Sequence, residues 1–135
     1  MDCATVSTCH SLKIIPISRL TRFARIKSRV VMMTLGEADD AEAVPGSIKL
    51  SNSSESGVVK KKITFERSNV SDITADLLDG YKVSRLIATY VDESGKKRVV
   101  GSPDFPLSLD YGTDGGVFTV TLQGEDTAPD AFLAE

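Results

Sequence analysis

The sequence predicts a mainly β (α+β) fold, an antiparallel β-sandwich or flattened barrel of about eight strands with one short α-helix. The strongest observation is a hairpin in which apolar and polar side chains alternate on both sides of the Gly- and Asp-rich turn 112–116. Such alternation is typical of an antiparallel strand pair with one buried face. The apolar rows of this hairpin are Leu107, Leu109 and Tyr111 before the turn, and Phe118, Val120 and Leu122 after it.

Composition favours the same fold class. Tryptophan is absent and aromatic residues make up 6% of the chain, so the core must consist mainly of Val, Ile and Leu, which suit strands. With 135 residues, 41% hydrophobic and 26% charged, the chain has the size and balance of one globular domain. We expect a flexible N-terminal tail at 1–10, a single β-rich domain at 11–123 and an acidic C-terminal tail at 124–135.

The first part of the chain contains a short strand and an ambiguous stretch. Residues 12–17 have the pattern of a strand, which Pro16 restricts to a sheet edge or a bulge. The stretch 20–35 carries apolar residues at helical spacing, namely Leu20, Phe23, Ile26 and Val30. Its finish is instead β-branched and apolar, as in a buried strand. Because helix caps are missing at both ends, a long strand is favoured over a helix.

The next stretch predicts a loop and a second hairpin. Residues 36–46 are acidic and alanine-rich and end in a Pro-Gly pair, which indicates a loop. Alternating strands at 47–51 and 59–66 flank the polar turn 52–57. Lys61 begins the inward row of the second strand, near the strand end, where its ammonium group is expected to reach water.

One helix is predicted at 71–79. Ser71 is suited to the N-cap, Asp72 lies favourably in the first turn, and Gly80 is suited to the residue that ends the helix. Its apolar face would consist of Ile73 and Leu77, with Leu78 beside them. A helix of about two turns has to be held by tertiary packing, because isolated helices this short are unstable in water.

The remaining strands complete the sheet pattern. Residues 82–91 are apolar on both faces, which is typical of a central strand, and 96–100 return alongside after a turn. Beyond Gln123 the chain is too acidic and turn-like for regular structure. Phe132 and Leu133 leave two readings open: a tail folded back onto the core, or an anchor into a neighbouring subunit.

Charge is divided unevenly along the chain. Residues 1–35 carry six bases and one acid, and the remainder carries ten bases and eighteen acids, so net charges of +5 and −8 underlie the total of −3. The basic segment can serve nucleic acid, or it can meet the acidic surface of another subunit in a homo-oligomer. Only Phe23 is interleaved for stacking between Arg19 and Arg29, and the overall pI is acidic, so assembly is favoured. The candidate interface residues are Arg19, Arg22, Arg25, Arg29, Phe132 and Leu133.

No pattern predicts catalysis, a metal or a cofactor. Cys3, Cys9 and His10 lack the paired spacing of a zinc site, and a Cys–His pair in a flexible tail is not held for attack. The turn 110–115 resembles the start of a calcium loop, but the position of its final glutamate is Thr121. We therefore expect a non-enzymatic protein. Two cysteines favour a reducing compartment, and no apolar run reaches the roughly 18–20 residues of a membrane helix.

The second half of the chain, from Phe65 onward, resembles small structural proteins encoded in prophage and mobile-element regions of bacteria. The segments that carry the resemblance are 98–103, the Pro-bounded 106–109, and the acidic stretch 124–133. The resemblance implies a tail or head–tail component of a virion, located in the bacterial cytoplasm or in the particle. It further implies assembly into a ring or tube with copies of itself or other virion proteins, without a cofactor and without catalysis.

Overall fold

The structure is a computed structural model and describes residues 10–36, 38–44, 46–68, 71–92, 94–127 and 131–133. Within these ranges it contains eleven strands, one α-helix and one 3-10 turn, so the mainly β prediction is confirmed. The elements in chain order are β1 (His10–Pro16), η1 (Ile17–Arg19), β2 (Leu20–Ile26), β3 (Arg29–Thr34), β4 (Asp39–Asp40), β5 (Lys49–Glu55), β6 (Val58–Arg67), α1 (Asp72–Lys82), β7 (Leu86–Val91), β8 (Lys97–Val100), β9 (Ser108–Asp114), β10 (Val117–Asp126) and β11 (Ala131–Leu133).

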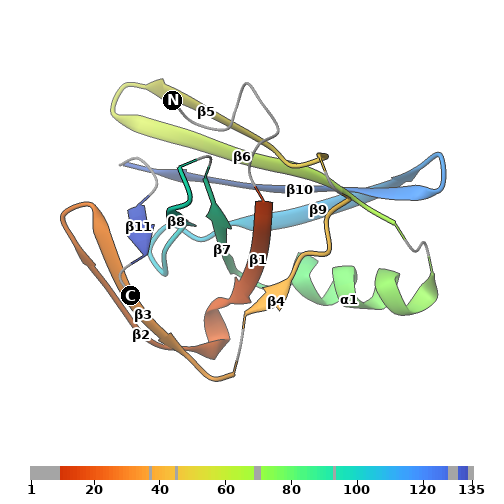
Figure 1. Cartoon of the computed structure of the whole chain (residues 1–135), viewed down its shortest axis with the longest axis horizontal. Helices are drawn as coiled ribbons and strands as arrows, with labels where there is room; N and C mark the ends of the chain where they lie inside the picture. The colour runs from red at the N-terminus through yellow and green to blue at the C-terminus, as the bar shows by residue number, and fades with distance from the viewer. Residues whose placement is uncertain are drawn as a thin grey trace.

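The strands form two sheets. The smaller has four strands in the order β5-β6-β10-β9, and the larger has seven in the order β2-β3-β11-β8-β7-β1-β4 (Figure 1). Every strand pair is antiparallel except β11 with β3, which is parallel. The predicted hairpin of residues 107–122 is present as β9 and β10, and the predicted hairpin of residues 47–66 as β5 and β6.

The main core lies between the two sheets. Strand β7 supplies Leu86 and Ala88, and Ile63 and Val120 approach them from the smaller sheet. Residues 86–90 are all buried, which confirms a central strand covered on both faces. The strand begins at Leu86 rather than at Lys82, because α1 continues through Lys82.

Residues 10–40 form one long hairpin that bends at η1. Ile14 pairs with Asp39 before the bend, and Leu20 pairs with Thr34 after it. The pair β1–β4 and the pair β2–β3 are therefore two parts of the same hairpin. The predicted long strand at 20–35 is therefore a strand, β2, a tight turn at Lys27–Ser28 and a second strand, β3. The bent half closes over the face of β7 and β8 that is turned away from the sandwich, and there forms a second apolar cluster around Val30, Ile87, Val99 and Ala131.

The helix α1 differs from its prediction in length and in orientation. Ser71 is the N-cap as predicted, since its Oγ accepts a hydrogen bond from the Thr74 N–H at 3.2 Å. The helix does not end at Gly80, which is helical, but runs on to Lys82. Its buried face is formed by Thr74, Leu78 and Tyr81. The predicted apolar face is wrong for its two leading members, because Ile73 and Leu77 are exposed.

The C-terminal prediction is also corrected. The stretch from Gly124 was expected to lack regular structure, but β10 continues to Asp126. Residues Ala131–Leu133 then enter the larger sheet as β11, between β3 and β8. The predicted N-terminal tail lies outside the described residues except for His10, whose backbone begins β1. In the described part of the chain, no helix has the length and apolar character needed to cross a lipid bilayer.

Candidate functional site: a basic apolar face on β2, β3 and β11

Strand register gathers basic and apolar side chains on one face of the larger sheet. Arg22 pairs with Met33 and Ile26 with Arg29 across β2 and β3, and Arg29 in turn lies opposite Phe132 of β11. Side chains of directly paired residues point to the same side of a sheet. We call this surface, made of Arg22, Ile26, Arg29, Met33 and Phe132, the basic apolar face.

The local sequence explains why these side chains point outward. Successive residues of a strand alternate between the two faces, so Phe23 and Met32 point inward and join the second apolar cluster, and their neighbours Arg22 and Met33 point outward. On β11, Ala131 and Leu133 point into the same cluster, which leaves Phe132 on the outer side.

The apolar members of the face are markedly exposed. Ile26 is 65% exposed, Met33 59% and Phe132 38%, and Leu35 just beyond β3 is 66% exposed. Among the described residues these are four of the eight large hydrophobic side chains that are exposed. Single exposed apolar side chains need no explanation, but several on adjoining strands are typical of an interaction surface.

Phe132 lies between two arginines. It is paired with Arg29 of β3 on one side and with Arg98 of β8 on the other. The Arg98 guanidinium lies 4.2 Å from the ring centroid, a cation–π geometry. Arg98 also bonds to Asp92 at 3.4 Å. Burial alone would raise the pKa of Asp92, but hydrogen bonds from Ser94, Lys96 and Arg98 hold this pKa below its usual value, so the carboxylate stays charged.

The six candidate interface residues from the sequence do not form one surface. Arg22, Arg29 and Phe132 come together on the basic apolar face. Arg25 pairs with Val30 on the other side of the hairpin, where its Nε donates to the Lys27 carbonyl oxygen, and Leu133 joins the second apolar cluster. The sequence alone did not identify Ile26 and Met33 as interface residues. Once the turn is placed at Lys27–Ser28, strand alternation puts both side chains on the outer face.

The sixth candidate, Arg19, belongs to a partly buried group of hydrogen-bonded side chains at the bend of the hairpin. Its guanidinium donates two hydrogen bonds to Asp39, both at 2.9 Å, and the Tyr81 hydroxyl donates to the same carboxylate at 2.5 Å. The hydrogen bonds from Arg19 hold the pKa of Asp39 below its usual value, and burial raises the pKa of Tyr81. Both groups are held in the protonation state they already have at neutral pH, which suits a structural link between η1, β4 and α1 rather than proton transfer.

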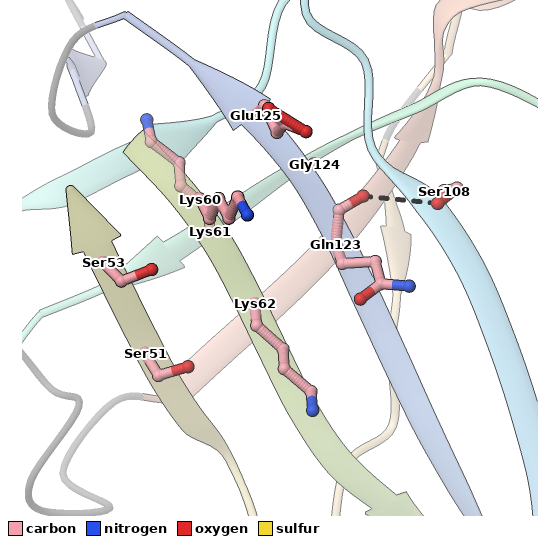
Figure 2. A pocket seen from close by; sticks show the side chains of 9 residues that line it. All are labelled: Ser51, Ser53, Lys60, Lys61, Lys62, Ser108, Gln123, Gly124 and Glu125. Atoms are coloured by element: carbon pink, nitrogen blue, oxygen red, sulfur yellow. Dashed lines mark hydrogen bonds between the residues drawn. The ribbon is translucent and has the colours of Figure 1, made fainter. Parts of the chain in front are cut away.

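A hollow of about 520 Å³ lies on the smaller sheet, lined by Ser51, Ser53, Lys60, Lys61, Lys62, Ser108, Gln123, Gly124 and Glu125 (Figure 2). Figure 2 shows one hydrogen bond among these residues, from the Ser108 hydroxyl to the Gln123 carbonyl oxygen at 3.3 Å. A serine nucleophile needs a hydrogen bond to its base, and none links Lys60 or Lys62 to a serine here. The hollow has the character of a solvated sheet face.

The other chemical candidates remain separate from one another. Asp126 is paired with Lys61, and Asp110 with Lys82 at 3.4 Å. Within the described ranges, no three His, Cys, Asp or Glu side chains lie close enough to hold a metal ion. Cys3, Cys9 and Asp130 and the side chains of His10 and Asp114 lie outside the described residues.

Comparison of the chain with protein-family models, with curated proteins and with solved structures finds no match.

Proposed function

We propose that the protein is a non-enzymatic assembly protein that binds its partner through the basic apolar face. The observation that carries the proposal is the presence of Ile26, Met33 and Phe132, all exposed, beside Arg22 and Arg29 on adjoining strands. Exposed apolar area supplies the driving force for association, and the arginines select a partner of opposite charge.

The edge position of β2 supports the same proposal. Among the described residues, β2 ends the larger sheet and pairs only with β3, so its outer backbone edge has no strand partner there and can accept another chain. Two copies of β2 placed side by side would bring arginines against arginines, which disfavours pairing between identical edges. Charge therefore favours an acidic partner surface.

In this proposal the molecule is a small tail or head–tail component of a prophage-encoded virion. Copies of itself or other virion proteins are its partners, and it resides in the bacterial cytoplasm or in the particle. The resemblance of residues from Phe65 onward supports this assignment, together with a mainly β fold that presents sheet edges. Identification of virion genes beside its own gene would test it.

The assembly proposal predicts that reversing the charge of the basic apolar face weakens association between copies. We expect the parent chain to show a mass above the monomer that rises with concentration in light scattering. The variant Arg22→Glu/Arg29→Glu should weaken association at least tenfold while its thermal unfolding is unchanged, because both side chains are exposed.

The matched control is Lys60→Glu/Lys62→Glu, which makes the same change of charge on the smaller sheet and should assemble like the parent. A parent chain that stays monomeric at high concentration would contradict self-association, and an arginine variant that assembles as well as the parent would contradict the role of the basic apolar face.

Phe132, with the Arg98 guanidinium over its ring and Arg29 paired with it on β3, favours single-stranded nucleic acid as a second candidate partner. If this is the function, a labelled oligonucleotide should bind at low salt, lose affinity steeply as salt rises, and bind about tenfold more weakly to Phe132→Ala. Absence of binding near 50 mM salt would reject this candidate.

A further inference from the structure

The outer face of α1 is a second exposed apolar surface, and its charge is opposite to that of the basic apolar face. Ile73 is 78% exposed and Leu77 41% exposed, and the two lie four residues apart on one side of the helix. Asp72 and Asp76 have the same spacing on the adjoining row and are also exposed. We call this surface, made of Asp72, Ile73, Asp76 and Leu77, the acidic helix face.

The packing of α1 leaves the acidic helix face outward. Thr74, Leu78 and Tyr81 are the buried residues of the helix, and they occupy the opposite side. The Asp79 carboxylate is engaged by the Tyr111 hydroxyl at 2.6 Å, which ties the helix to β9. Val83, directly after the helix, is 87% exposed.

The two surfaces account for most of the exposed apolar side chains. Of the eight large hydrophobic residues exposed in the described part of the chain, four lie on or beside the basic apolar face, two lie on the acidic helix face and Val83 directly follows α1. The hairpin of β2 and β3 lies toward one end of the longest axis of the molecule and α1 toward the other (Figure 1). One copy therefore presents two apolar surfaces of opposite charge on elements that lie toward opposite ends of the molecule.

We infer that the partner of the basic apolar face is the acidic helix face of a second copy. This inference rests on the proposed assembly function and names its partner. Because the two surfaces differ, the contact is head-to-tail, and each added copy uses one surface and leaves its other surface free for the next copy. Such contacts close into a ring if the rotation between copies allows it and otherwise continue as a filament.

The experiment combines two charge reversals. One variant carries Arg22→Glu/Arg29→Glu and the other Asp72→Lys/Asp76→Lys. Each alone opposes like charges at the contact, so we expect at least tenfold weaker association for both by light scattering and sedimentation. An equimolar mixture should assemble again, because each chain then offers a surface that complements the other, and a single chain with all four substitutions should assemble on its own.

A third variant, Ile73→Ser/Leu77→Ser, removes the apolar contact and leaves the charges and the N-cap of α1 intact. It should also weaken assembly at least tenfold, and thermal unfolding checks that each variant is folded. If the arginine variant is monomeric while the folded serine variant assembles like the parent, the head-to-tail partner is wrong and the assembly function stands. If all variants assemble like the parent, both are wrong.

Discussion

Lys61 shows how one charged side chain secures the end of a strand. Its ammonium group was expected to reach water, because Lys61 lies near the end of its strand. Instead β10 runs on to Asp126, and the Lys61 ammonium lies 3.6 Å from that carboxylate, with 2% and 8% of the two side chains exposed. The interior position followed from strand alternation, but the partner depends on a segment sixty-five residues away that has no local signal for a strand.

The pair should be costly to break from one side. We expect Lys61→Met to lower the free energy of unfolding by about 3–5 kcal/mol, because it leaves the Asp126 carboxylate buried without its partner. The double variant Lys61→Met/Asp126→Leu should recover most of this loss. Denaturant unfolding followed by circular dichroism measures both. Lys60→Met, an exposed neighbour, is the control and should change stability by less than about 0.5 kcal/mol. Equal effects at the two lysines would show that the pair contributes nothing specific.

Asp39 leads to a prediction about pH. The pKa of its carboxyl is lowered in the folded protein, mainly by the Arg19 hydrogen bonds. The stability that this carboxylate contributes is therefore fully present above the unfolded pKa of about 4. It is lost as the pH falls through the lower pKa of the folded protein. Asp39→Asn should therefore destabilise by about 1 kcal/mol at pH 7, discounted for partial exposure, and progressively less below about pH 4. Unfolding curves of the parent and the variant, recorded between about pH 2 and about pH 7, measure the difference in their free energies of unfolding. A difference that stayed constant with pH would disprove the link, and Asp40→Asn is the exposed control.

At the scale of elements, α1 shows where a helical pattern stops being informative. Apolar residues at Ile73, Leu77 and Leu78 allow two orientations of the helix. Tyr81 decides between them, because the helix continues past Gly80 and the buried Tyr81 hydroxyl bonds to Asp39. Both facts depend on tertiary contacts that the local pattern does not contain.

Neighbouring leucines of α1 should respond very differently to truncation. Leu78 is 1% exposed in the main core, and Leu78→Ala should destabilise by about 2–5 kcal/mol through lost burial and the cavity left behind. Leu77→Ala, the matched control, should cost less than about 1 kcal/mol, since Leu77 is exposed. Thermal or urea unfolding of both variants would check this. A larger loss at Leu77 would mean that the helix is oriented as the sequence predicted.

The hairpin of β2 and β3 shows why residues 20–35 resembled a helix. The pairing register shifts between Leu20 and Arg22, so Leu20 and Phe23 share a face although they are three residues apart. A strand with such a bulge loses its strict alternation and imitates helical spacing. The missing helix caps correctly favoured strand over helix. The turn itself was not predicted, because Lys27–Ser28 contains no glycine although Lys27 adopts a positive φ of 58°, a conformation for which glycine is the usual signal.

At the scale of the whole molecule, alternation along Leu107–Leu122 was enough to predict a sandwich, because each strand pair of that kind is local in sequence. The order of the larger sheet was not predictable in the same way. β11 pairs with β3 across about a hundred residues of chain, and no local pattern indicates that contact. The charge division predicted a basic surface, and its acidic counterpart on α1 became visible only when the buried side of the helix was known.

β11 has a consequence for how the larger sheet holds together. β1 joins one half of the long hairpin to β7, but the other half, β2 and β3, is joined to β8 through β11. Release of Ala131–Leu133 from the sheet would therefore separate β3 from β8 and open the cluster that contains Val30 and Val99. A strand of three residues thus controls whether water reaches the interior of the bent hairpin.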